Sequence, residues 1–277
     1  MRRLVALAAM AAFGGGVYLG LGALRSTASA PAARPTAVHA RIDVSGTMFL
    51  AQQGSLYRLR DGAFTKLNPG PAGSWMQPVL TPDHTHLVAV LRAGPFSDLY
   101  LLDLDGHVVR QITNDAGGKG LLSHWAFYPR VSPDGQTLYY SYDAPKYVDD
   151  YRVDLAIWSM PLGGAQRLAR RQSTFNDYTG GDTFPVPLAG GGLLYAKYAI
   201  GAKGPYSQIW YQARSLSPGR ALTQPEDDCG QPALSPDASR LAMICTGGAQ
   251  VGRLEVAALD AAGNLGPPRT LVDGVLC

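Results

Sequence analysis

The chain has 277 residues, of which 16% are charged, and its 33 glycines and 20 prolines make turns frequent. Soluble domains usually carry about 25% charged residues, so this composition favours short strands over long amphipathic helices. With 46% hydrophobic residues, the chain is neither disordered nor a protein that crosses a membrane many times. The formal charge of +3 comes from Arg2, Arg3 and Arg25, and without them no basic excess remains to bind nucleic acid.

Residues 1–30 have the features of an export signal. Two arginines follow the initial methionine, residues 4–24 are uncharged and apolar, and small residues at 28–30 offer a cleavage site. The apolar run is longer than the ~7–15 residues of a usual signal and near the ~20 that span a bilayer, so an uncleaved membrane anchor is the alternative. We expect residues 31–41, rich in proline and alanine, to link this segment to a domain at 42–277. Both alternatives place that domain outside the cytoplasm, as a periplasmic, cell-surface or secreted protein.

Two sequence units recur along the predicted domain at intervals of about 50 residues. The first reads Pro-x-x-Ser/Thr-Pro-Asp and begins at Pro78, Pro129 and Pro232, with a decayed copy at Pro185. The second is an aliphatic residue followed by an aromatic one, and its copies are Leu56-Tyr57, Leu99-Tyr100, Ile157-Trp158 and Ile209-Trp210. Two units that keep the same phase indicate a repeat architecture.

Each repeat contains four predicted strands. The first enters the Pro-Asp turn, where proline sets φ and the Ser and Asp side chains cap the bend. The second is apolar, at 87–91, 138–142, 193–198 and 241–245. The third carries the aliphatic–aromatic pair, and the fourth is an Arg-x-aliphatic segment beginning at Arg110, Arg167, Arg220 or Arg269. Four-stranded antiparallel sheets at this spacing predict an all-β fold, a β-propeller of five blades, with a sixth if the protein extends beyond Cys277. A β-sandwich is the alternative, but it would not need the same turn at a fixed period.

These blades resemble those of TolB-type propellers, which carry the same Ser-Pro-Asp-Gly turn and Ile-Tyr strand, over residues 42–274. The resemblance implies a non-catalytic scaffold of the cell envelope, with peptidoglycan-associated or transport proteins as partners. Related propellers also occur in prolyl-oligopeptidase-like hydrolases. The alternative is therefore a substrate-gating domain of such a hydrolase, whose catalytic part is absent from this chain. The repeated residues build blades rather than sites, so they indicate the fold and not the ligand.

The cysteines are placed in register with the repeat. Cys229 and Cys245 lie at equal distances on either side of Asp237, the turn residue of one unit. In an antiparallel hairpin centred there they face each other near disulfide reach, and export supplies an oxidising compartment. We predict a Cys229–Cys245 disulfide, the alternative being two buried thiols. Cys277 lies about one period after Cys229, which favours the start of a sixth blade over a five-bladed ring closed by residues 36–44.

No catalytic motif is found in the sequence. It contains no Gly-x-Ser-x-Gly elbow, no His-Glu-x-x-His and no Gly-x-Gly-x-x-Gly after a strand, so we expect no enzyme activity and no cofactor. His84 and His86 are interpreted as surface side chains of a turn, and the acidic residues at 149–154 lack the spacing of a calcium loop. We therefore expect no metal site.

The longest predicted loops connect second to third strands and successive blades, which places them on one face of a propeller. They span residues 92–98, 114–128, 143–154, 173–184, 200–207 and 224–231. About half of the 21 acidic residues lie in these loops among aromatic residues, although Asp in exposed turns and aromatics at blade junctions would give the same composition. An acidic, aromatic rim suits a protein partner, a cationic peptide or a glycan. We predict that this long-loop face binds a protein or a cell-envelope polymer. The candidate binding residues are Trp125, Asp149, Asp150, Tyr151, Asp177, Tyr178 and Asp227.

Overall fold

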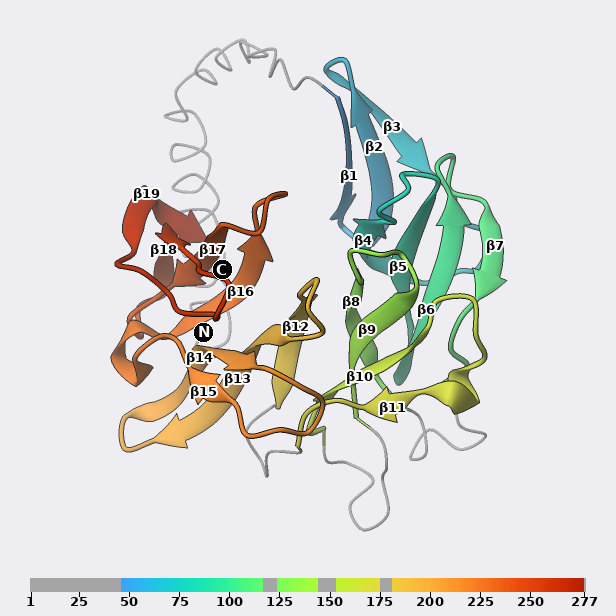
Figure 1. Cartoon of the computed structure of the whole chain (residues 1–277). Helices are drawn as coiled ribbons and strands as arrows, with labels where there is room; N and C mark the ends of the chain where they lie inside the picture. Colours follow the sequence, from blue (N-terminus) through green and yellow to red (C-terminus); the bar gives the residue numbers. More distant parts are fainter. Residues whose placement is uncertain (1–45, 117–123, 144–152, 175–180, 277) are drawn as a thin grey trace, which may run out of the picture. The chain divides into compact units, whose positions relative to one another are not determined.

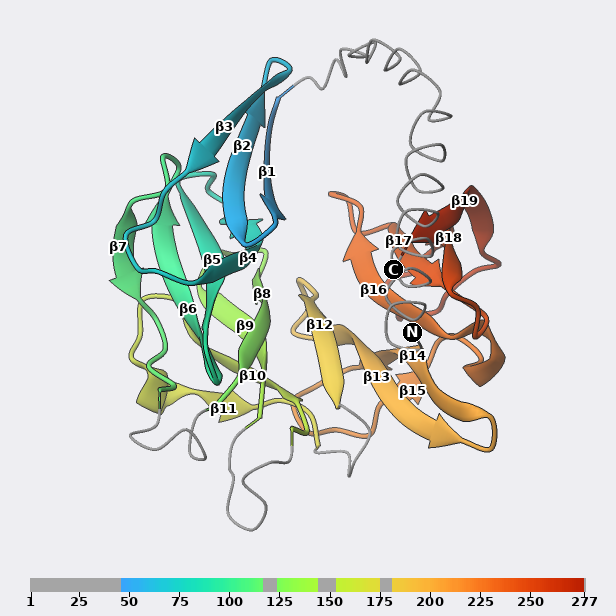
Figure 2. The ribbon, with the colours of Figure 1, turned by 180° about the vertical axis from the view of Figure 1, so that it is seen from behind.

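The structure, a computed structural model, describes residues 46–116, 124–143, 153–174 and 181–276 (Figure 1). Five antiparallel sheets follow one another in chain order as the blades of a β-propeller, which confirms the predicted all-β fold (Figure 2). The first blade contains β1 (Thr47–Gln52), β2 (Ser55–Arg60) and β3 (Ala63–Leu67). The second contains β4 (Ser74–Leu80), β5 (His86–Ala93), β6 (Phe96–Asp103) and β7 (Val108–Gln111).

The remaining blades have four strands each, in chain order across the sheet. The third contains β8 (Ala126–Val131), β9 (Thr137–Tyr142), β10 (Ala156–Pro161) and β11 (Arg170–Arg171). The fourth contains β12 (Asp182–Pro187), β13 (Leu193–Gly201), β14 (Gly204–Gln212) and β15 (Arg220–Ala221). The fifth contains β16 (Cys229–Leu234), β17 (Arg240–Cys245), β18 (Val251–Ala258) and β19 (Arg269–Leu276). In the described segments, two short 3₁₀ helices, η2 (Gln166–Leu168) and η3 (Pro225–Asp227), lie between strands.

The first blade differs from the others because only three of its strands are described. Its pair Leu56-Tyr57 lies in β2, whereas the corresponding pairs of the next three blades lie in their third strands. Strands β1 to β3 therefore correspond to the second, third and fourth strands of a blade. The predicted segments 1–30, 31–41 and 36–44 lie outside the described residues.

The Ser/Thr-Pro-Asp turns join first to second strands through a repeated set of hydrogen bonds. In the fifth blade the Ser235 hydroxyl donates to the Asp237 carboxylate at 2.6 Å, and the backbone N–H of Ser239 donates to the same carboxylate at 3.1 Å. The turns at Thr81–Asp83 and Ser132–Asp134 repeat the hydroxyl-to-carboxylate bond at 2.6 and 2.5 Å. These short-range contacts explain why the turn residues recur, since they close each hairpin locally.

The first proline of each repeat occupies a bulge in the first strand. The residue before it has a left-handed backbone, with φ of 52° at Gln77, 53° at Tyr128, 52° at Phe184 and 52° at Gln231. At each of these places the pairing with the second strand shifts its register. A proline cannot donate a hydrogen bond to a sheet ladder, so a bulge is where a strand tolerates one. Even the decayed copy of the repeat retains this feature.

The core is built from second strands that are covered on both sides. Side chains of Leu87–Leu91 in β5 are 0–3% exposed. Val88 and Val90 pack in a cluster with Leu138 of the third blade, whereas the alternate residues of β5 pack in a cluster with Leu56 of the first blade. Burying a large aliphatic side chain contributes roughly 1.5–3 kcal/mol, so contact between successive sheets dominates the stability of the fold.

Arginines of the fourth strands connect one blade to the next. The Arg110 guanidinium in β7 donates to the backbone carbonyl oxygens of Leu162 and Gly164, in the turn between the third and fourth strands of the third blade. Arg220 in β15 likewise donates to the carbonyl oxygen of Gly263 at 2.8 Å in the fifth blade. The Arg-x-aliphatic unit therefore has a structural role between blades.

The predicted fourth strand at Arg167 is wrong. Arg167 lies in η2, and the fourth strand of the third blade is the short β11. The Gln166 side chain accepts a hydrogen bond from the backbone N–H of Asn114 at 2.9 Å and donates one to the Asp115 carboxylate at 2.6 Å. These tertiary contacts hold the segment in a helical turn, and they do not show in the local sequence pattern.

The predicted disulfide joins the first and second strands of the fifth blade. Cys229 and Cys245 are direct partners in the register of β16 and β17, and their sulfur atoms are bonded. Both residues are almost fully buried, with 1% and 0% exposure. The prediction from their symmetric placement about Asp237 is confirmed.

We expect replacement of both Cys229 and Cys245 by alanine to lower the free energy of unfolding by roughly 3 kcal/mol, because the bond closes a loop in the unfolded chain between residues 16 apart. Urea unfolding followed by tryptophan fluorescence measures the change. The variant Cys277→Ser removes a thiol without breaking the bond and is the control. Equal stability of the double variant and this control would contradict the expectation.

The turn aspartates should make stability depend on pH in the acidic range. Hydrogen bonds from Ser235 and Ser239 lower the pKa of Asp237 from 3.8 to about 2. A carboxylate whose pKa is lowered by folding stabilises the protein above its unfolded pKa, and this contribution is lost as pH falls through the folded pKa. We therefore expect Asp237→Asn to melt at a lower temperature than the wild type at pH 6. The deficit should shrink between pH 4 and about pH 2, as thermal melts by circular dichroism can show, and a constant deficit would exclude this role.

Candidate functional site

Of the seven predicted binding residues, two lie in described segments. Trp125 precedes β8, and Asp227 ends η3. The other five, Asp149, Asp150, Tyr151, Asp177 and Tyr178, lie outside the described residues. The site is therefore built from the part of the long-loop face that the structure describes.

Two predicted loops of this face are hairpins instead. Strands β5 and β6 stay paired as far as Ala93 and Phe96, and β13 and β14 as far as Gly201 and Gly204. A glycine with positive φ turns each chain, Gly94 at 65° and Gly204 at 122°. The β13–β14 hairpin consequently projects as ordered structure and can form one wall of a site.

Aromatic side chains form a row that crosses from the third blade to the fourth. The Trp125 ring stacks on Phe127 with centroids 5.6 Å apart, and Phe127 lies 5.9 Å from Tyr128. The Tyr128 ring is 4.0 Å from Phe184 in β12. The Arg92 guanidinium lies 5.3 Å from the centre of the Trp125 ring. All four rings are partly exposed, so the row offers flat apolar surface beside a cation.

The acidic rim predicted from the sequence is largely buried in the described segments. Five of its carboxylates have exposures of 6% or less, namely Asp98, Asp115, Asp143, Asp154 and Asp182. The Asp143 carboxylate accepts a hydrogen bond from the backbone N–H of Trp125 at 2.7 Å, and Asp182 lies 3.2 Å from the ammonium of Lys197. These aspartates hold loops and strands in place, and the interpretation of them as an exposed rim is wrong.

Asp115 is the centre of a hydrogen-bond network between the second and third blades. Its Oδ1 accepts from the Tyr142 hydroxyl at 2.8 Å and from the Gln166 amide at 2.6 Å. Its backbone N–H donates to the Asp98 carboxylate at 2.7 Å. Burial raises the pKa of Asp115 to about 6, against the opposing effect of the bonds from Tyr142 and Gln166, and burial also raises the pKa of Asp98. The carboxyl groups of Asp115 and Asp98 therefore stay protonated to a higher pH than exposed carboxyl groups do.

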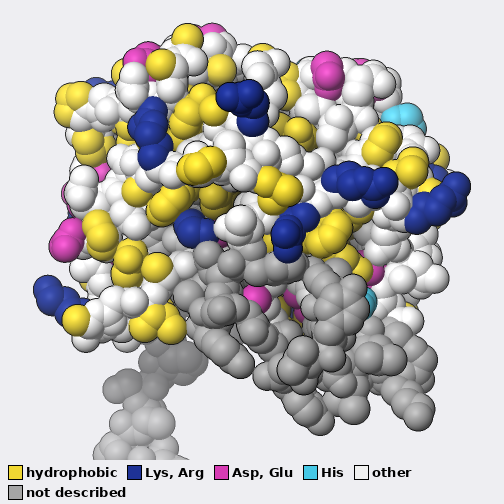
Figure 3. All heavy atoms as spheres, turned by 60° about the horizontal axis from the view of Figure 1, so that its bottom comes forward, with side chains coloured by type: hydrophobic (Ala, Val, Ile, Leu, Met, Phe, Trp, Pro, Cys, Tyr) yellow, Lys and Arg dark blue, Asp and Glu magenta, His cyan; other side chains and the backbone are white. Residues whose placement is uncertain are grey.

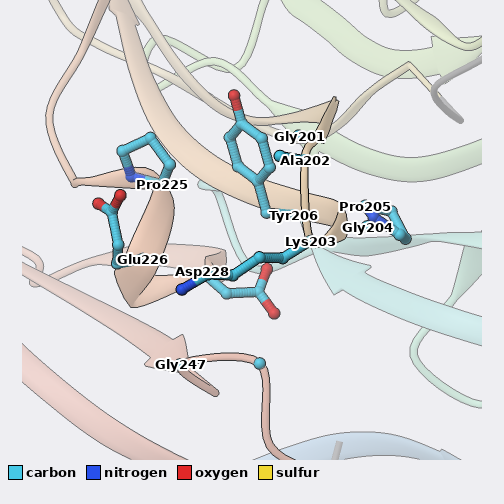
Figure 4. Close-up of a pocket in the computed structure, with 11 residues that line it drawn as sticks. Gly201, Ala202, Lys203, Gly204, Pro205, Tyr206, Pro225, Glu226, Asp228 and Gly247 are labelled. Atoms are coloured by element: carbon cyan, nitrogen blue, oxygen red, sulfur yellow. The ribbon is translucent and has the colours of Figure 1, made fainter.

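A pocket of about 440 Å³ lies at the junction of the fourth and fifth blades (Figure 4). One wall is the tip of the β13–β14 hairpin, Gly201–Tyr206, and another is the connection with Pro225, Glu226 and Asp228. Gly247, in the loop between β17 and β18, completes it. These are loops between second and third strands and between blades, the kinds that the sequence assigns to the long-loop face.

Asp228 holds the walls of this pocket together. Its Oδ1 accepts from the backbone N–H of Ser207 at 2.7 Å and from the Ser207 hydroxyl at 3.0 Å, while Oδ2 accepts from the Thr246 hydroxyl. Asp228 has φ of 46°, in the left-handed region that Asp tolerates better than most residues. One carboxylate thus joins the hairpin of the fourth blade to the loop of the fifth.

The predicted binding residue Asp227 also has a structural contact. Its carboxylate accepts from the backbone N–H of Gln224 at 3.1 Å as part of a capping box around η3, and its carbonyl oxygen accepts from the N–H of Gly247 at 2.9 Å. The exposed charges of the pocket are instead those of Glu226 and Lys203, which its adjacent walls carry. Neither residue was singled out as a binding residue from the sequence, because the pocket depends on contacts between loops far apart in the chain.

The pocket combines two carboxylates, those of Glu226 and Asp228, with one ammonium, the ring of Tyr206 and the backbone of glycines. This set can bind a polar chain through charge pairs and stack a ring or a proline against Tyr206. Within the described segments, His, Cys, Asp and Glu do not form any group of three or more that could hold a metal ion. The same segments contain no helix that is long and apolar enough to cross a membrane.

No protein-family model matches the sequence, and no curated protein matches it either. Among solved structures, the chain is similar to a TolB-assigned protein from Agrobacterium tumefaciens, with a TM-score of 0.61 and 20% identity over 82% of this chain and 76% of that one. The fold is of the TolB type. TolB from Acinetobacter baumannii matches with a TM-score of 0.54 and 17% identity over 80% of this chain and 50% of its own. A puromycin-hydrolysing peptidase from Mycobacterium tuberculosis matches with a TM-score of 0.50 and 19% identity over 76% of this chain and 34% of its own. The chain therefore spans half of the Acinetobacter baumannii protein and about a third of the peptidase.

The Asp115 network should make the free energy of unfolding depend on pH with a sign opposite to that of the turn aspartates. A carboxyl whose pKa folding raises from 3.8 to about 6 binds its proton more tightly in the folded state. Its contribution to stability is therefore lost as pH rises from about 4 to about 6. Relative to the wild type, Asp115→Asn should gain up to roughly 3 kcal/mol of unfolding free energy across this interval.

Urea unfolding at pH 4, 5, 6 and 7 measures this difference between variant and wild type. Asp61→Asn is the control for removal of an exposed charge, since this carboxylate of the first blade is 85% exposed and only loosely paired with Arg60 at 3.6 Å. If the difference in unfolding free energy between Asp115→Asn and the wild type did not change with pH, Asp115 would have no raised pKa in the folded protein.

Proposed function

We propose that this protein is a non-catalytic, extracytoplasmic propeller that binds a protein partner or a cell-envelope polymer through its long-loop face. The observation that carries the proposal is the pocket at the junction of the fourth and fifth blades. Its walls come from three loops of that face, and Asp228 fixes them to one another by three hydrogen bonds. A pre-organised pocket of this kind binds without first losing entropy to order its loops.

The aromatic row from Trp125 to Phe184 supports the same proposal. Stacked, partly exposed rings provide large contact area at low entropic cost, and aromatic residues are enriched where binding energy concentrates. Arg92, over the Trp125 ring, adds a cation at one end of the row. Export of the protein is supported by residues 1–30 and by the disulfide, which needs an oxidising compartment to form.

A second candidate is the propeller module of a larger peptidase. The likeness of the fold to the puromycin-hydrolysing peptidase supports it, with a TM-score of 0.50 over 34% of that chain. In that case the long-loop or opposite face would contact a hydrolase domain instead of an envelope component. The pocket variants below separate the two candidates, because the first requires capture by the propeller alone.

Replacement of Tyr206 by Ala together with Glu226 by Gln should weaken capture of the partner by about tenfold or more, since it removes the stacking ring and the exposed carboxylate of the pocket. The immobilised full chain is incubated with solubilised envelope proteins and, separately, with purified cell-wall polymer of the host. Bound material is compared between variants by mass spectrometry and by sugar analysis.

The matched control replaces two exposed side chains of β3, Phe64 by Ala and Lys66 by Gln, which lie in the first blade. A component retained by the wild type and by this control, but lost with the pocket variant, supports the proposal. Identical capture by all three chains, with unchanged melting temperatures, would remove the pocket from the interface.

A further inference from the structure

Positive charge is concentrated in one stretch of the third and fourth blades. Between Pro161 and Gln224 the sequence contains seven basic residues, Arg167, Arg170, Arg171, Lys197, Lys203, Arg214 and Arg220. It contains two acidic residues, of which Asp177 lies outside the described residues and Asp182 is 0% exposed beside Lys197. The described part of this stretch therefore contributes no exposed carboxylate of its own to the surface.

The fold brings several of these arginines into one surface. The loop between β14 and β15 packs against β11, because the backbone N–H of Leu216 donates to the carbonyl oxygen of Gln172 at 2.8 Å. The Ser215 hydroxyl lies 3.4 Å from the carbonyl oxygen of Arg171. Gln212 donates to the carbonyl oxygens of both Gln172 and Arg214 at 2.7 Å and so ties the two segments together.

We call this surface the basic patch and define it by Arg167, Leu168, Arg170, Arg214 and Leu216. All five side chains are exposed, and the strands that carry or flank them, β11 and β15, are the last strands of their sheets. Figure 3, which turns the lower side of Figure 1 forward, shows Lys and Arg side chains set among hydrophobic ones, with few Asp or Glu between them outside the grey atoms. The patch therefore lies at the outer edge of these two blades.

The two leucines distinguish the patch from an ordinary charged surface. Leu168 is 42% exposed and Leu216 is 49% exposed. Leu216 also has φ of 55°, a left-handed conformation that is uncommon for a leucine and is held by its bond to Gln172. The turn in which it lies is closed by the N–H of Ser217, which donates to the carbonyl oxygen of Arg214 at 3.1 Å, so the exposed side chain is presented at a fixed place.

The combination of guanidinium groups and exposed leucines fits an anionic lipid surface. Each Arg near such a surface gains from the negative surface potential and from hydrogen bonds to phosphate, while leucines enter the boundary between headgroups and acyl chains. A soluble polyanion would satisfy the arginines but offers nothing apolar to Leu168 and Leu216. A bilayer is therefore the partner that can contact all five side chains of the basic patch favourably.

The same chain carries a second feature related to membranes. Residues 4–24 form an uncharged apolar run, and if they remain as an anchor, the chain from Arg25 to Gly46 can extend no more than about 80 Å. A propeller tethered at that distance is at high effective concentration near the bilayer. A surface with only weak affinity for lipid would therefore hold it in one orientation.

We propose that the basic patch docks the outer edge of the third and fourth blades onto a bilayer that contains anionic phospholipid. This leaves the pocket at the junction of the fourth and fifth blades as a separate site, and the proposal does not depend on the function proposed above. It adds a lipid partner to the protein or polymer partner.

The test uses the full chain and vesicles of phosphatidylcholine, with or without an equal amount of phosphatidylglycerol, in sedimentation assays at limiting lipid. The measured quantity is the ratio of the two partition coefficients. For Arg167→Gln/Arg170→Gln/Arg214→Gln we expect this ratio to fall by at least about tenfold relative to the wild type. Arg2, Arg3 and Arg25 are the same in every chain and cancel in the comparison.

The matched control neutralises three exposed bases elsewhere, Arg60→Gln/Lys66→Gln/Arg269→Gln, and should keep the wild-type ratio. A further variant, Leu168→Ser/Leu216→Ser, should weaken binding to the anionic vesicles and leave binding of soluble polyphosphate unchanged. Equal ratios for both triple variants would overturn the proposal. Patch-dependent binding of polyphosphate without patch-dependent binding of vesicles would also overturn it and would make a soluble polyanion the partner.

Discussion

Contact between the apolar faces of successive sheets is the interaction on which this structure depends. A second strand such as β5 sends alternate side chains into two different clusters, one shared with the blade before and one with the blade after. A single four-stranded sheet could not bury both faces, so a blade is stable only beside its neighbours. The polar contacts between blades, such as those of Arg110, Arg220 and Asp228, then fix the angle and register at which the faces meet. The pocket lies at one of these junctions because loops from two blades converge there.

The aspartates of this chain divide into two classes with opposite electrostatics. Those of the turns, such as Asp83 and Asp237, are exposed, accept several hydrogen bonds and have lowered pKa values. Those of the blade junctions, such as Asp98 and Asp115, are buried and have raised pKa values because desolvation outweighs their hydrogen bonds. Both classes count alike as acidic residues, so composition alone does not separate them.

The features that were predictable from the sequence are those governed by short-range chemistry. The Ser-Pro-Asp turns close through bonds within a few residues, and the pairing of Cys229 with Cys245 follows from symmetry about one such turn. Because these local patterns repeat with a constant period, they were sufficient to predict the propeller fold.

What the sequence did not reveal depends on contacts between distant segments. Gln166 binds Asn114 and Asp115 and converts an expected strand into η2, and the same kind of contact buries Asp98 in what was expected to be an exposed rim. The pocket joins residues of the hairpin near Lys203 to Gly247 of another blade. No spacing rule relates those positions, because their proximity is a product of the completed fold.

The disulfide of the fifth blade has a consequence for the pocket that lies next to it. Asp228 and Thr246, whose side chains bind each other, are the immediate neighbours of Cys229 and Cys245. The covalent bond and the carboxylate–hydroxyl contact therefore act on the same two strand ends, one residue apart. Molecules held in a reducing environment would keep their hydrophobic clusters yet have a looser pocket rim. Oxidation of the two thiols would thus act as a maturation step that stiffens the pocket as well as the hairpin.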